Sequence, residues 1–159
     1  MSAVAADPGY ARILLATEGR EIPDAAIERI AELADRSGET PPSVRVLSIA
    51  RVHGVAFGLP NPGLMPTRQE LDDQRRIVAR AVKRLRKRGI GASGRVLGTR
   101  KATARICEEA LRTECQAIVM AADADRNRIV GDMLWTQEPQ RVRRRARVPV
   151  FLVADETGG

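Results

Sequence analysis

The chain has 159 residues, about the length of one domain with a full core, and 43% are hydrophobic and 30% charged, as in an ordinary globular protein. No apolar run is long enough to span a membrane, and the first ten residues lack the features of a secretory signal. The net charge of +7 is carried almost entirely by arginine. We expect one cytoplasmic domain over residues 11–154, between flexible tails at 1–10 and 155–159.

The first part of the chain alternates between strand and helix patterns. Residues 12–17, RILLAT, are typical of a buried strand, and 23–38 follow as a helix that is expected to end at Gly38. A second strand is predicted over 44–52. The segment 53–66 is rich in glycine and proline and is predicted to form a long loop.

A second helix has a clear start and end. Thr67 followed by Glu70 three residues later is a capping box, in which each side chain satisfies a free backbone amide at the helix start. Gly89 is expected to end this helix. The apolar stripe that should face the core consists of Leu71, Val78, Val82 and Leu85.

The rest of the chain repeats the alternation. Strands are predicted over 93–98, 117–122 and 148–154, with a helix over 101–114 and another from Pro139 to about residue 146. The helix over 101–114 is expected to turn four apolar residues inward, which are Ala102, Ile106, Ala110 and Leu111. Strands that alternate with helices form a mostly parallel sheet, so the predicted fold is a single-domain α/β three-layer sandwich of the flavodoxin or Rossmann type.

Such sheets bind ligands outside the carboxyl ends of the strands, where the strand order reverses. The turn after the first strand and the loop after the fourth are therefore the candidate binding segments. The fourth strand opens into a loop that carries Asp123, Asp125, Asn127 and Arg128 and has no glycine before Gly131. The start of this loop matches a calcium-loop pattern, but Arg128 and Leu134 stand where that pattern requires glycine and glutamate, so no metal site is predicted.

Basic residues gather in two places. Residues 74–107 contain twelve basic and no acidic residues, and 141–147 read RVRRRAR. One interpretation is a solvated arginine-rich surface, and the alternative is a patch that binds nucleic acid or another polyanion. No aromatic residues are interleaved for base stacking, so only weak, non-specific binding is expected.

Catalytic constellations are not found. His53, the only histidine, falls in the predicted loop, whereas Cys107 and Cys115 fall near the end of one predicted helix, about 12 Å apart. That separation is too long for a disulfide, so both cysteines are interpreted as small buried apolar residues. We predict neither an enzyme nor a bound cofactor.

The order of elements, ILLATEG at the first strand, the long loop after the second and the ending QRVRRRARVPVFLV resemble the universal stress protein superfamily over about residues 11–154. The resemblance implies a five-stranded sheet of order 3-2-1-4-5. It also implies a nucleotide site in some members, built from an acid-Gly-Ser turn after the first strand and a loop G-x2-G-x9-G-S/T after the fourth.

This sequence departs from that site pattern. The first turn is Glu18-Gly19-Arg20, and Ala121 to Ala124 stand in the glycine region, where side chains block close approach of the backbone to phosphates. The resemblance therefore implies a branch without the nucleotide motif. We expect a crevice closed by side chains, with Leu134 or Trp135 lying over it. Any altered ligand pocket that is retained would use Glu18, Gly19, Arg20, Asp123 and Arg126.

The function expected from this resemblance is a regulatory or stress-response module that acts through an unidentified protein partner. The last strand lies at the sheet edge in the resembled family and pairs with its twin. In this chain that strand is short, apolar and uncharged, which favours a homodimer. The predicted interface residues are Val148, Val150, Phe151, Leu152 and Val153.

Overall fold

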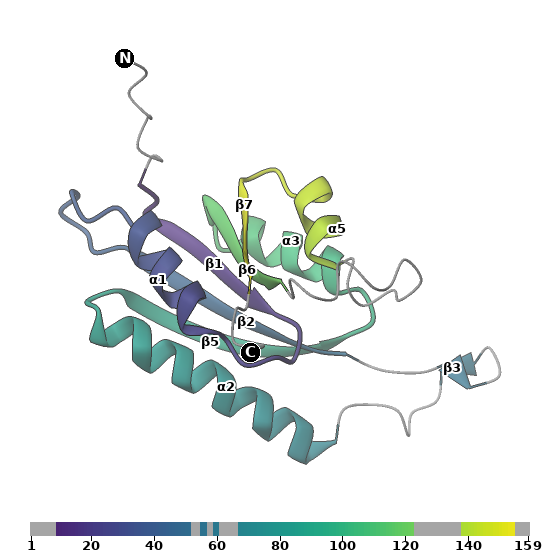
Figure 1. Ribbon diagram of the computed structural model, residues 1–159. Coiled ribbons are helices and arrows are strands. Elements are labelled where there is room, and N and C mark those ends of the chain that lie inside the picture. The colour runs from purple at the N-terminus through teal and green to yellow at the C-terminus, as the bar shows by residue number, and fades with distance from the viewer. Residues whose placement is uncertain (1–8, 52–54, 57–58, 61–66, 123–137, 155–159) are drawn as a thin grey trace.

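The computed structural model describes residues 9–51, 55–56, 59–60, 67–122 and 138–154. Its centre is a five-stranded sheet of order β5-β2-β1-β6-β7, in which all neighbouring strands are parallel (Figure 1). When the five strands of this sheet are numbered 1 to 5 along the chain, their order is 3-2-1-4-5, as predicted. The strands are β1 (Arg12–Thr17), β2 (Ser43–Arg51), β5 (Gly91–Thr99), β6 (Ala117–Ala122) and β7 (Val150–Ala154).

Helices cover both faces of the sheet and make the predicted three layers (Figure 1). On one face, α1 (Asp24–Leu33) and α2 (Arg68–Lys87) pack against the side chains of β1, β2 and β6 that project from this face, and together they form an aliphatic cluster. On the other face, α3 (Ala102–Arg112) and α5 (Glu138–Arg145) enclose a second cluster. In the described part of the chain, no helix has the length and apolarity needed to cross a membrane.

Helix α2 begins and ends as the sequence predicts. The Thr67 hydroxyl accepts a hydrogen bond from the Glu70 amide at 3.1 Å, and the Glu70 carboxylate accepts one from the Thr67 amide at 3.2 Å. Gly89 follows the helix with a φ of +75°, a conformation that glycine adopts without strain. The buried face is shifted from the prediction, because Ile77 and Ala81 join Val78 and Leu85 while Leu71 and Val82 are half-buried.

Helix α2 also packs very closely on the sheet. Gly94 of β5 lies beneath it, and a Cβ atom at this position would overlap Cγ1 of Val78 and lie 3.1 Å from the Val46 carbonyl oxygen. Only glycine leaves enough room for the helix at this point, since the valine is branched and held in the core.

Three predictions about the elements are wrong. Helix α1 ends at Leu33 rather than at Gly38. The Tyr10 amide donates to the Leu33 carbonyl at 2.8 Å, and the Tyr10 carbonyl accepts from the Asp35 amide at 2.9 Å. These bonds hold the segment after Leu33 in an extended bridge to Tyr10, so the helix cannot continue. Leu111 was expected to be buried and is 61% exposed. The predicted loop 53–66 contains a small antiparallel pair, β3 (Val55–Ala56) and β4 (Leu59–Pro60), and its other residues lie outside the described part.

The cysteines agree with their interpretation as small packed residues. Cys115 is buried, Cys107 is half-buried, and both are free thiols. Burial raises the pKa of each thiol, even though Arg145 acts in the opposite direction on Cys107. Both groups are therefore neutral near pH 7.

Candidate functional site

The strand order reverses at β1, which lies between β2 and β6. The chain leaves β1 toward β2 on one side and returns through β6 on the other, so the carboxyl ends of β1 and β6 form the edge where open sheets bind ligands. The described residues at this edge are 17–20 after β1 and the last residues of β6. Asp123 and Arg126, like Leu134 and Trp135, lie outside the described residues.

The turn after β1 has a fixed shape. The Thr17 side chain is buried and its hydroxyl donates a hydrogen bond to the Arg20 carbonyl at 3.0 Å, which closes the turn from inside. Gly19 has a φ of +72°, in the left-handed region where any other residue is strained. The predicted residues Glu18 and Arg20 flank Gly19, are half-buried, and each makes an interaction with the surrounding chain. The structure thus brings three of the five predicted ligand residues together.

A glutamine from α2 occupies the space beside this turn. The Gln74 side-chain amide donates to the Gly19 carbonyl at 3.2 Å, and its oxygen accepts a short hydrogen bond from the hydroxyl of Ser48 on β2. Ser48 is completely buried, so this bond satisfies a polar group that water cannot reach. The side-chain amide nitrogen of Gln74 would be only 3.3 Å from a Cβ placed on Gly19.

Neither Gln74 nor Ser48 was predicted from the sequence as a site residue. The available signal was Ser48 itself, a single hydroxyl within the apolar run VLSIA, which requires a buried partner. Nothing local shows that the partner is a residue 26 positions later on a helix. Ser48, Gln74 and Gly19 together link β2, α2 and the turn after β1. Their hydrogen-bonding groups are paired with one another and would have to be released before a ligand could bond to them.

Four of the arginines of α2, and Arg88 just after the helix, are paired with acids. Within the helix, Arg75 bonds Asp72 at 2.8 Å and Arg76 bonds Asp73 at 3.3 Å. Toward α1 and the turn before it, three more arginines pair with acids across the helix–helix boundary, namely Arg80 with Glu21, Arg84 with Asp24 and Arg88 with Glu28. These pairs agree with the interpretation of a solvated helix face and leave less unpaired positive charge for a polyanion.

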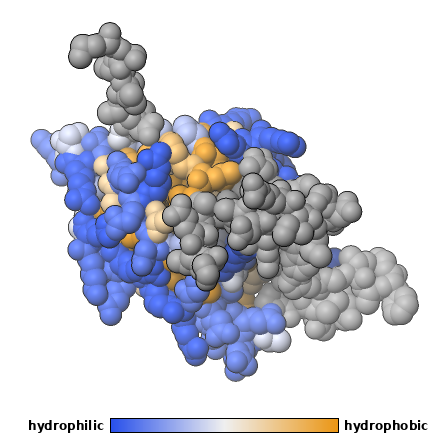
Figure 2. Space-filling model, in the orientation of Figure 1, coloured by the Kyte–Doolittle hydropathy of each residue, from blue (hydrophilic) through white to orange (hydrophobic). Residues whose placement is uncertain are grey.

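The edge strand β7 carries an apolar surface. The side chains of Val150, Phe151, Leu152 and Val153 are half-buried in the single chain, and Figure 2 shows apolar surface gathered over the β7 edge between hydrophilic regions. The Phe151 ring packs edge-on against Tyr10 at 6.0 Å between ring centres, and the Arg29 guanidinium lies over it at 5.1 Å. The predicted interface residue Val148 lies just before the strand.

Residues 9–154 match the model of the universal stress protein family. A universal stress protein from Archaeoglobus fulgidus is similar in structure, with a TM-score of 0.65 and 20% sequence identity over 91% of this chain and 93% of the other. A structure of the universal stress protein from Archaeoglobus fulgidus in complex with dAMP has a TM-score of 0.59 and 20% identity, covering 90% and 97% of the two chains.

A universal stress protein family member from Arabidopsis thaliana with AMP bound has a TM-score of 0.58 and 14% identity, covering 92% of this chain and 93% of the other. No curated protein matches this chain in sequence. Because the sequence identities are 20% or lower, the solved structures support the fold alone. Membership of the family is supported by the match to its model.

Proposed function

Because the chain belongs to the universal stress protein family, we propose that it is a stress-response or regulatory module that acts through protein contacts as a homodimer and does not bind ATP. The observation that carries the proposal is the apolar edge strand β7. The proposal contains no catalytic step and no cofactor.

The β7 edge supports the homodimer. Among the described residues, β7 pairs with β6 alone, so its other side presents backbone donors and acceptors next to half-buried apolar side chains. An edge of this kind favours association with another strand, and a second copy in antiparallel orientation satisfies the backbone groups of both chains in one closed two-fold interface. The interface would consist of Val148, Val150, Phe151, Leu152 and Val153.

Two features argue against ATP. The Gly19 carbonyl and the Ser48 hydroxyl at the strand-order reversal are already bonded to Gln74, so a nucleotide would have to displace this side chain. Residues 121–124, at the end of β6 and just after it, read AADA where the resembled motif has glycines, and phosphate-binding loops need exposed backbone amides. Losing several charge-assisted hydrogen bonds, each worth roughly 1.5–3 kcal/mol, removes micromolar affinity.

The second candidate is an altered nucleotide pocket at the same edge. Two of the similar solved structures contain the monophosphates dAMP and AMP, which carry fewer charges than ATP and require fewer phosphate contacts. The pocket would use Glu18, Gly19 and Arg20 together with Asp123 and Arg126.

Calorimetry with ATP and magnesium, and separately with AMP, distinguishes these functions. The first proposal expects no saturable heat with either nucleotide at millimolar concentration, and light scattering that gives the mass of two chains at micromolar protein. Saturable binding of AMP alone would establish the second candidate. A dissociation constant for ATP in the low micromolar range, or ATP carried through purification, would contradict both features that argue against ATP.

A further inference from the structure

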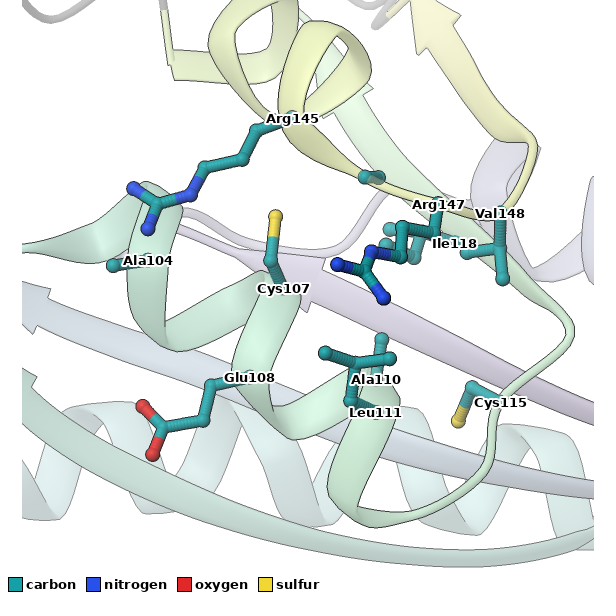
Figure 3. Close-up of a pocket in the computed structure, with 11 residues that line it drawn as sticks. Ala104, Cys107, Glu108, Ala110, Leu111, Cys115, Ile118, Arg145, Arg147 and Val148 are labelled. Carbon is teal, nitrogen blue, oxygen red and sulfur yellow. The ribbon is translucent and has the colours of Figure 1, made fainter.

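A cavity of about 480 Å³ lies between α3 and the segment that joins α5 to β7 (Figure 3). It is bordered by Ile118 at the start of β6 and by Val148 just before β7, so it lies at the amino ends of these strands. This is the edge of the sheet opposite the turn at 17–20. The cavity is therefore separate from the candidate nucleotide edge, and its size falls in the range of small-molecule sites.

The inner surface of the cavity is apolar. It is formed by Ala104, Ala110 and Leu111 of α3 together with Ile118 and Val148. Leu111 is the exposed large hydrophobic residue of the described chain, with 61% of its surface accessible. A side chain of this size with most of its surface accessible indicates that apolar material can be buried here with a gain in free energy.

Two cations stand at the mouth of the cavity. Arg145 ends α5 and Arg147 follows two residues later, and Figure 3 shows the Cys107 side chain directed between their guanidinium groups. Both arginines are exposed, and no carboxylate among the described residues pairs with either. The nearby Glu108 is bonded to Arg105 at 3.2 Å, and in Figure 3 its carboxylate points away from the two guanidinium groups.

We propose that this cavity binds a small apolar carboxylate, in which a hydrocarbon chain or ring ends in one carboxyl group. The apolar part would lie against Leu111 and Val148, whose side chains are accessible from the cavity. The carboxylate would lie at the mouth beside the Cys107 thiol and accept charge-assisted hydrogen bonds from Arg145 and Arg147, since guanidinium groups bind planar oxyanions well. Two unpaired cations beside an apolar surface complement a monoanion with a tail, whereas a polyphosphate would leave most of its charge unmatched and the apolar wall uncovered.

Octanoate, below its micelle-forming concentration, is a suitable probe. Calorimetry should give saturable binding at one site per chain, and 1-octanol and acetate should each bind at least about tenfold more weakly, because each lacks one half of the ligand. Octanoate should also slow alkylation of Cys107 by iodoacetamide, since this thiol lies at the mouth while Cys115 is buried. Equal affinity for 1-octanol and octanoate, or no saturable binding, would overturn the proposal.

Matched arginine variants test the assignment within one segment. The double variant Arg145→Gln, Arg147→Gln should weaken octanoate binding by about tenfold or more. The control Arg143→Gln, Arg144→Gln removes the same charge from exposed positions that do not line the cavity and should leave binding within about twofold. Leu111→Ser should weaken octanoate binding with only a small loss of stability, of about 1 kcal/mol or less, since most of this residue's surface is exposed. Equal losses in the two double variants would show a general charge effect and refute the site.

Discussion

Glu109 of α3 accepts a hydrogen bond from Arg45 of β2 at 3.3 Å, although this glutamate is only 3% exposed. Its carboxylate also bonds Arg112 on the same helix at 2.7 Å and Arg95 of β5 at 3.4 Å. One buried acid thus holds three arginines from a helix and two strands, and Arg45 reaches on to the Ser93 hydroxyl at 3.0 Å. The cluster ties α3 to the β2–β5 side of the sheet, where α3 faces polar as well as apolar side chains.

Replacing this acid should destabilise the protein. In Glu109→Gln the three arginines lose their shared negative partner, and we expect a loss of about 1–3 kcal/mol in the free energy of unfolding. This loss of stability is smaller than the loss from breaking a fully buried ion pair, because the arginine side chains are 25–53% exposed and partly solvated. Urea unfolding measures it. Glu108→Gln, one residue away and exposed in its pair with Arg105, is the control and should change stability by less than about 0.5 kcal/mol.

The same residue predicts a pH dependence. Burial alone would raise the pKa of Glu109, but hydrogen bonds from Arg112 and Arg45 and the charge of Arg95 outweigh it and hold the pKa below its ordinary value of 4.5. The unfolded chain then binds the proton more readily than the folded chain, so this stabilisation is complete above pH 4.5 and is lost as the pH falls through the folded-state pKa. The stability difference between the natural protein and Glu109→Gln should shrink over that range. A difference that stays constant down to pH 3 would contradict the lowered pKa.

Gly94→Ala should destabilise the protein through overpacking. The new methyl group overlaps Val78 and approaches the Val46 carbonyl, so α2 must move away from β5 at a cost of about 1–3 kcal/mol. Gly91→Ala, on the same strand, is the control, since its Cβ would meet nothing closer than the Pro42 carbonyl oxygen at 3.5 Å. Urea unfolding of both variants measures the difference. Equal stabilities would show that α2 does not pack as closely as described.

Val150→Pro should dissociate the proposed dimer while the single chain stays folded. The Ile118 amide donates to the Pro149 carbonyl at 2.9 Å, and in a parallel ladder this bond directs the amide of Phe151 toward β6 and those of Val150 and Leu152 toward the open edge. Proline at 150 removes an outward donor at the first residue of an edge strand, where proline is tolerated. Light scattering should give one chain for the variant and two for the natural protein, with unchanged circular dichroism. A natural protein that scatters as one chain at micromolar concentration would refute the dimer.

Duplex DNA should bind weakly and without sequence preference. Half of the α2 cations, namely Arg75, Arg76, Arg80 and Arg84, are engaged with acids, and so is Arg88 just after the helix. This pairing reduces the positive charge that can replace counterions on a phosphate backbone. Fluorescence anisotropy should show an affinity that falls steeply between 50 and 200 mM salt, as expected for a purely electrostatic contact. Submicromolar, sequence-selective binding at physiological salt would contradict this interpretation of α2.

Much of the candidate edge could be located from the sequence, but its contents could not. The strand–helix alternation placed Glu18, Gly19 and Arg20 at the reversal of strand order, because the position of that edge follows from topology. The bond between Gln74 and Gly19 joins residues 55 positions apart. No local pattern indicates which helix residue reaches a given turn, and the predicted residues Asp123 and Arg126 lie outside the described part.

The sequence by itself determined the order of the main elements, the parallel sheet, the capping box of α2 and its end at Gly89, because backbone periodicity and capping act within a few residues. Tertiary structure alone decided where α1 stops, since the Tyr10 bridge competes with the helix beyond Leu33. It also decided that Leu111 is exposed beside a cavity and that Glu109 is buried among three arginines. Both outcomes depend on which distant segments lie against α3, and burial is a property of that packing rather than of the periodicity of one helix.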